Sequence, residues 1–124
     1  MIKILLAEDD DVMREYLARA LERSGYAVSA VDRGTAALPL IERETFDLLL
    51  TDIVMPEMDG IELAQKAQEM APGMRVMFIT GVAAVTLKAG SAMPHARVLS
   101  KPFHLRDLVL EVDRLFNVDN AELI

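Results

Sequence analysis

Apolar residues along this chain fall into two patterns. Short continuous runs are typical of strands buried on both faces, and apolar residues spaced three or four apart are typical of amphipathic helices. The runs predict strands at 1–7, 26–31, 48–52, 76–80 and 98–99. The spaced pattern predicts helices around 13–21, 35–44, 63–71 and 105–116. Strands and helices therefore alternate along most of the chain.

Two segments give a weaker pattern. Val82 to Ala89 is rich in alanine and fits a short helix, whereas Gly90, Pro94 and other small residues nearby fit a loop, so both structures stay open for 81–96. From Asn117 onwards the helical pattern stops, and we expect the end of the chain to fray.

Residues typical of helix caps and turns mark several of the predicted boundaries. Asp10 or Asp11 fits the N-cap of the first helix, and Gly25 fits the position just beyond its end. The dipeptide Asp59-Gly60 is typical of a turn, and we expect Asp59 to shape this turn rather than to act chemically.

Alternating strands and helices predict an α/β fold with a doubly wound, five-stranded parallel sheet and helices on both faces. A length of 124 residues fits one domain. We expect this domain to span 1–117 and to be followed by a C-terminal tail, 118–124.

Composition and charge exclude several classes of protein. The apolar fraction of 52% is too high for a disordered chain, and no apolar stretch approaches the roughly 18 residues of a membrane span. The N-terminal apolar run is too short for a signal peptide, and the absence of cysteine fits a reducing compartment, so we expect a cytoplasmic protein. A net charge of −7 with scattered basic residues argues against direct contact with nucleic acid.

Polar residues that could carry chemistry follow four of the predicted strands. Glu8 and Asp9 end the first strand, Asp52 ends the third, Thr80 the fourth, and Lys101 follows the fifth. In a parallel α/β sheet, ligands bind beyond the carboxyl ends of the strands. We therefore expect these five side chains to meet at one edge of the sheet.

Such a set of groups favours phosphoryl chemistry. Three adjacent carboxylates need a counter-charge, and oxygen ligands without nearby histidine or cysteine suit Mg²⁺. Asp52 would be the nucleophile that attacks phosphorus, with Lys101 and the Thr80 hydroxyl contacting phosphoryl oxygens. Each residue alone has an ordinary structural explanation: Asp52 could cap a turn, Thr80 could simply end a strand, and Lys101 could be a surface lysine. Only the five residues together indicate this chemistry.

The same residues carry a resemblance to a known family. Glu8-Asp9, Asp52, Met55 to Gly60, Thr80-Gly81 and Lys101-Pro102-Phe103 resemble, in order and spacing, the receiver domain of two-component response regulators. The resemblance implies a flavodoxin-like (CheY-like) fold with strand order 2-1-3-4-5. It also implies a signalling domain rather than an enzyme. We expect a stand-alone receiver with no output domain.

The resemblance also assigns a role to each residue of the set. Asp52 would be the phosphoacceptor, Thr80 the switch hydroxyl and Lys101 the phosphoryl-binding lysine. Mg²⁺ would be held by Glu8, mostly through water, by Asp9 and Asp52, and by the backbone carbonyl of Val54. The implied donor is a phosphohistidine on a histidine kinase or histidine phosphotransferase in a phosphorelay, and the Lys101-Pro102 bond is expected to be cis.

Residues 48–60 and 99–108 are especially similar to the CpdR-like receivers, which control regulated proteolysis in bacteria. This similarity implies a downstream protein partner, an AAA+ protease among the candidates. One position departs from the family, because Val98 stands where an aromatic side chain often moves together with the switch threonine. We therefore expect a rearrangement of 81–96 to transmit the signal.

Two other functions remain open at this point. A Mg²⁺-dependent phosphohydrolase also uses an aspartate nucleophile, but it usually needs a general acid two residues later, where this chain has Val54. A receiver-like scaffold that is never phosphorylated would not need the acid pair, Thr80 and Lys101 together.

Overall fold

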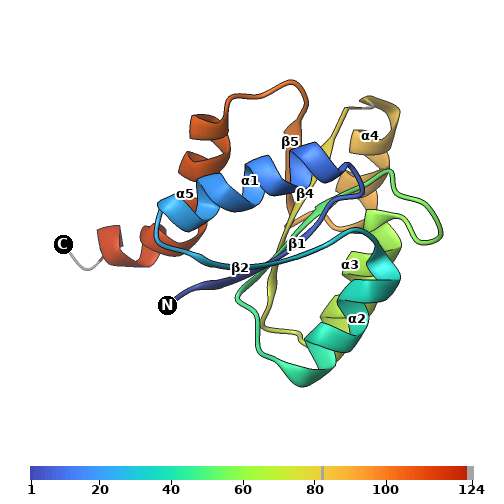
Figure 1. Ribbon diagram of the computed structural model, residues 1–124, viewed down its shortest axis with the longest axis horizontal. Coiled ribbons are helices and arrows are strands. Elements are labelled where there is room, and N and C mark those ends of the chain that lie inside the picture. Colours follow the sequence, from blue (N-terminus) through green and yellow to red (C-terminus); the bar gives the residue numbers. More distant parts are fainter. Residues whose placement is uncertain (82, 123–124) are drawn as a thin grey trace.

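Five parallel strands form the central sheet of the computed structural model, in the order β2-β1-β3-β4-β5 (Figure 1). The strands are β1 (Lys3–Ala7), β2 (Ala27–Val31), β3 (Leu48–Asp52), β4 (Arg75–Thr80) and β5 (Arg97–Ser100). The helices are α1 (Asp11–Arg23), α2 (Gly34–Arg43), α3 (Gly60–Met70), α4 (Ala83–Ala92) and α5 (Leu105–Glu122). The structure describes residues 1–81 and 83–122, without the side chains of 83–87 and 117–122. The predicted strand order is confirmed.

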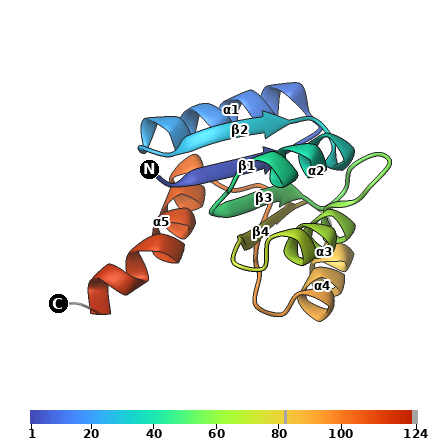
Figure 2. The same cartoon turned by 90° about the horizontal axis from the view of Figure 1, so that it is seen from below.

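Helices cover both faces of the sheet, as the sequence predicts (Figure 2). Helices α1 and α5 pack on one face, where they bury Leu17, Leu21, Leu108 and Val112 against the strands. Helices α2, α3 and α4 pack on the opposite face. Alternate residues of the inner strands point to opposite faces, so each strand contributes to both cores.

The most continuous apolar run of the sequence becomes the central strand. All five residues of β3 are buried, and β3 pairs with β1 on one side and β4 on the other. A strand in this position has no exposed face, which explains why its sequence does not alternate between apolar and polar residues. The same strand ends in Asp52, so the fold places a carboxylate at the end of its most buried strand.

Most of the predicted boundaries are confirmed to within a few residues. The side chain of Asp10 caps α1 by accepting a hydrogen bond from the Met13 amide at 2.8 Å. Gly25 follows α1 with a φ of 97°, a backbone conformation that glycine adopts without strain. Asp59 acts at the start of α3, where its side chain accepts from the Glu62 amide at 2.9 Å.

The two weakly patterned segments are both helical. The segment Ala83–Ala92 forms α4, so the helical alternative is confirmed there, while Val82 lies outside the described residues. Helix α5 continues to Glu122, beyond Asn117 where the helical pattern of the sequence stops, and 123–124 lie outside the described residues. The division at 117/118 stays a prediction. Among the described helices, none is long and apolar enough to cross a membrane.

A close backbone approach fixes the end of β3 against the start of α3. The Gly60 amide donates to the carbonyl of Ile53 at 2.7 Å. A Cβ atom at Gly60 would lie 2.0 Å from the carbonyl oxygen of Asp52, far inside van der Waals contact. The chain therefore needs glycine here to return past the strand end that carries Asp52.

We expect Gly60→Ala to lower the free energy of unfolding by more than about 2 kcal/mol, because the backbone at Asp52 must shift to admit the methyl group. Urea denaturation followed by circular dichroism measures this change. Gly73→Ala is the matched control, since a Cβ at Gly73 meets nothing within 4 Å. Equal stabilities of the two variants would contradict the close approach.

Candidate functional site

The carboxyl ends of the strands bring the predicted side chains together. Glu8 and Asp9 follow β1, and Asp52 ends β3, the strand beside it. Oxygen atoms of these three carboxylates lie within 4.8 Å of one another. Acids separated by more than 40 positions in the sequence thus form one cluster, as the strand-end pattern predicts.

Lys101 supplies the positive charge of this cluster. Its Nζ atom donates to Asp52 Oδ2 at 3.0 Å and to Glu8 Oε1 at 3.2 Å. Both carboxylates are buried, with Glu8 0% and Asp52 6% exposed. Burial lowers the pKa of Lys101, but the hydrogen bonds and charges of Asp52 and Glu8 raise that pKa above its ordinary value. The ammonium therefore stays protonated and offsets part of the negative charge.

Glu8 is the most perturbed acid of the cluster. Burial, joined by the charge of Asp52, raises the pKa of Glu8 to about 7, although the Asp10 amide and Lys101 both favour the ionised form. Glu8 Oε2 accepts from that amide at 3.2 Å. Burial thus disfavours the ionised form of Glu8 in spite of Lys101, and a second cation beside the cluster would favour it.

The donor set fits Mg²⁺. Its side-chain ligands are carboxylate oxygens, which hard divalent cations prefer. Asp9 is exposed while Glu8 and Asp52 are buried, so the cluster is open to solvent on one side. The loop after β3 brings Val54 next to Asp52, where the Val54 amide lies 3.4 Å from Oδ1. The ligand role of the Val54 carbonyl stays a prediction.

Thr80 lies at the end of β4 and is only 1% exposed. Its carbonyl accepts a hydrogen bond from the Lys101 amide at 2.7 Å, so the backbone joins the two residues. The Lys101-Pro102 bond is cis, as the resemblance implies. A cavity of about 500 Å³ opens beside Lys101, lined by Met13, Tyr16, Gly81, Lys101, Pro102, Phe103, His104 and Leu105.

Comparison with known proteins agrees with this geometry. The sequence matches the response regulator receiver domain family over residues 4–113. The chain belongs to the response regulator receiver family. Receiver domains are signalling domains that take phosphoryl groups from histidine kinases or phosphotransferases.

Individual relatives support the same assignment. The receiver is 58% identical to the response regulator receiver protein CpdR of Brucella abortus (strain 2308), over 93% of this chain and 97% of that protein. A CheY-like receiver from Methanospirillum hungatei JF-1 superposes with a TM-score of 0.87 at 31% identity, covering 98% of both chains. The response regulator TrrA of Thermotoga maritima, solved in complex with Mg²⁺ and BeF, gives 0.83 at 25% identity, covering 93% of this chain and 99% of that one.

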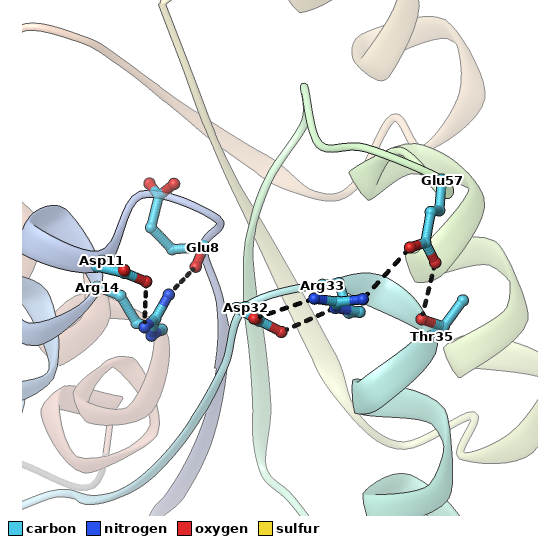
Figure 3. Close-up of polar contacts among 7 residues, drawn as sticks. All are labelled: Glu8, Asp11, Arg14, Asp32, Arg33, Thr35 and Glu57. Carbon is cyan, nitrogen blue, oxygen red and sulfur yellow. Dashed lines mark hydrogen bonds and ion pairs between the residues drawn. The ribbon is translucent and has the colours of Figure 1, made fainter.

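The structure also shows contacts around the receiver's site that the sequence pattern did not reveal (Figure 3). Arg14 reaches back to the loop that carries Glu8. Arg33, after β2, donates to Glu57 in the loop after β3 at 3.3 Å, and the Thr35 hydroxyl donates to the same carboxylate at 3.4 Å. Glu57 has a φ of 70°, which is uncommon for a residue with a side chain. The two Glu57 contacts join loops more than 20 positions apart in sequence, so no local pattern could have indicated them. The Arg14 contact spans only six positions and depends on how the loop after β1 turns into α1.

The raised pKa of Glu8 predicts how metal-free stability depends on pH. Because the folded-state pKa of about 7 exceeds the ordinary 4.5, the contribution of Glu8 to stability is full below about pH 4.5 and is lost as the pH rises towards 7. In chelator, the stability of the natural protein relative to Glu8→Gln should therefore fall between about pH 5 and pH 7, by at most about 1.4 kcal/mol per unit.

Chemical denaturation at several pH values measures this difference. Glu69→Gln, an exposed change on α3, controls for the altered net charge. A relative stability of Glu8→Gln that stays constant over this range would show that the Glu8 carboxyl is not perturbed.

Proposed function

We propose that the receiver accepts a phosphoryl group on Asp52 from a phosphohistidine donor and then changes its contacts with a protein partner. The observation that supports this proposal best is the environment of Asp52. Its buried carboxylate faces the Lys101 ammonium at 3.0 Å and shares one sheet edge with the Glu8 and Asp9 carboxylates. This set meets the needs of an aspartate nucleophile that works with a hard cation.

In the proposed reaction, a carboxylate oxygen of Asp52 attacks the phosphorus atom of the donor. A new O–P bond forms, the P–N bond to the imidazole breaks, and its electron pair stays on the imidazole nitrogen. Lys101 then neutralises one oxygen of the acyl phosphate, and the Thr80 hydroxyl donates to another. Glu8, Asp9, Asp52 and the Val54 carbonyl would hold Mg²⁺, which supplies positive charge for the acids and the phosphoryl oxygens.

Signal transmission is proposed to run from Thr80 into α4. Thr80 ends β4, and the chain continues through Gly81 to the start of α4 at Ala83. Val98 pairs with Phe78 in the sheet and packs with the core on the α4 side. A valine at this position cannot make the aromatic rotation expected in many receivers, so a shift of α4 itself is the proposed readout.

The proposed output is control of regulated proteolysis through a protein contact, with an AAA+ protease as the partner. This choice rests on the resemblance to the CpdR-like receivers, and the chain is 58% identical to CpdR over 97% of that protein. A partner of this kind would distinguish the phosphorylated from the unphosphorylated surface of the receiver.

Phosphorylation is tested with Mg²⁺ and a small acyl phosphate or phosphoramidate, followed by intact-mass spectrometry. The natural protein should gain one phosphoryl group per chain, and Asp52→Asn should gain none, because it lacks the nucleophile. Asp107→Asn, an exposed change on α5, should behave like the natural protein. Steady turnover of external phosphoesters would favour the phosphohydrolase. Absence of both phosphorylation and turnover would favour the scaffold.

The protease contact is tested by binding the receiver to the AAA+ unfoldase of the organism that encodes it, with and without Mg²⁺ and beryllofluoride as a phosphoryl mimic. We expect the dissociation constants of the two states to differ by about tenfold or more, a coupling free energy of about 1.4 kcal/mol. Equal affinities, or no binding in either state, would rule out the adaptor role and leave the phosphoacceptor role intact.

A further inference from the structure

Arg14 connects α1 to the loop that carries the acid pair (Figure 3). One guanidinium nitrogen donates to the backbone carbonyl of Glu8 at 3.0 Å, and another donates to Asp11 Oδ1 at 2.6 Å. The Arg14 side chain is only 22% exposed, so it is held much more tightly than a free surface arginine. A planar fork with several donors can bridge two acceptors in this way.

The carbonyl of Glu8 belongs to the peptide group that joins Glu8 to Asp9. Fixing that peptide fixes the positions of the Asp9 N and Cα atoms and so restrains the direction in which the Asp9 side chain leaves the backbone. Other contacts hold the Glu8 side of this peptide, because the Glu8 amide donates to the Val31 carbonyl at 3.1 Å and Lys101 holds the Glu8 carboxylate. Among the described residues, the exposed Asp9 carboxylate has no hydrogen bond or ion pair of its own. Its orientation depends on the backbone.

We propose that Arg14 is a positioning residue for the Mg²⁺ ligands, which aims Asp9 at Glu8 and Asp52 by clamping the Glu8–Asp9 peptide. The inference rests on the proposed Mg²⁺ site. Arg14 does not touch the reacting atoms. Its partner Asp11 neutralises the guanidinium locally, so the clamp adds little net positive charge beside the acids.

Positioning and simple electrostatics predict opposite effects of removing Arg14. A positive charge near the site repels a divalent cation, so its loss alone should tighten Mg²⁺ binding slightly. Loss of the clamp should weaken binding, because Asp9 must then be ordered at the moment of binding. The sign of the change in affinity therefore distinguishes the two roles.

The test measures Mg²⁺ affinity by isothermal titration calorimetry for the natural protein, Arg14→Ala, Arg14→Lys and Arg19→Ala. Arg19 lies on the same helix and pairs with Glu15. Arg19→Ala therefore makes the same charge change without affecting the loop that carries Glu8 and Asp9. We expect Arg14→Ala to raise the Mg²⁺ dissociation constant about tenfold. Arg19→Ala should stay within about twofold of the natural protein or bind slightly tighter. Arg14→Lys, which cannot span both acceptors, should show a smaller loss.

Thermal unfolding in chelator separates positioning from general stability. A lower melting temperature of Arg14→Ala with an unchanged Mg²⁺ affinity would overturn the inference, as would binding equal to or tighter than that of Arg19→Ala. If Arg14→Ala does not fold, the Mg²⁺ affinity of Arg14→Lys becomes the test. An Arg14→Lys affinity equal to that of the natural protein would then overturn the inference. No Mg²⁺ binding by the natural protein would instead overturn the proposed site itself, and the inference with it.

Discussion

Repulsion among the carboxylates of Glu8, Asp9 and Asp52 is the constraint on which this receiver depends. The parallel sheet places their oxygen atoms within 4.8 Å, and burial of Glu8 and Asp52 limits the screening of these two charges by water, whereas Asp9 is exposed. Burial, joined by the charge of Asp52, raises the pKa of Glu8, although Lys101 favours the ionised form. The folded chain thus holds an acidic site whose charges favour a divalent cation, and such a cation would in turn offset the charge of an incoming phosphoryl group.

The fold can carry this unfavourable cluster because the strands that bear its acids are inner strands of the sheet. The inner strand β3 is buried throughout and paired on both edges, and each face of the sheet has its own apolar core. Movement of Asp52 away from its neighbours would disturb both cores. The close approach of Gly60 to the Asp52 carbonyl also restricts movement of the backbone at Asp52. Packing of apolar residues therefore supports a charge arrangement that is unfavourable by itself.

Arginines at the rim extend this support to the loops. Arg14 contacts the loop after β1, and Arg33 links the loop after β2 to Glu57 in the loop after β3. The Arg33 pairs are largely exposed and contribute little to stability, whereas Arg14 is mostly buried and contacts the peptide between Glu8 and Asp9. The receiver thus relies on its core to place Asp52, and side chains from neighbouring elements contact the loops around the site.

The sequence by itself determined the five strands, the helices on both faces and the strand-end acids, because burial on both faces leaves continuous apolar runs. It left α4 open, since its small residues make no one-sided stripe, and it ended α5 too early at Asn117. Only the tertiary structure decided which atoms meet: Lys101 with Glu8 and Asp52, Arg14 with the Glu8 carbonyl, and Gly60 with Asp52. The Lys101 contacts join segments far apart along the chain, and they exist only once the sheet has formed. The Arg14 and Gly60 contacts are closer in sequence, but they depend on how the loops after β1 and β3 turn back against the packed elements.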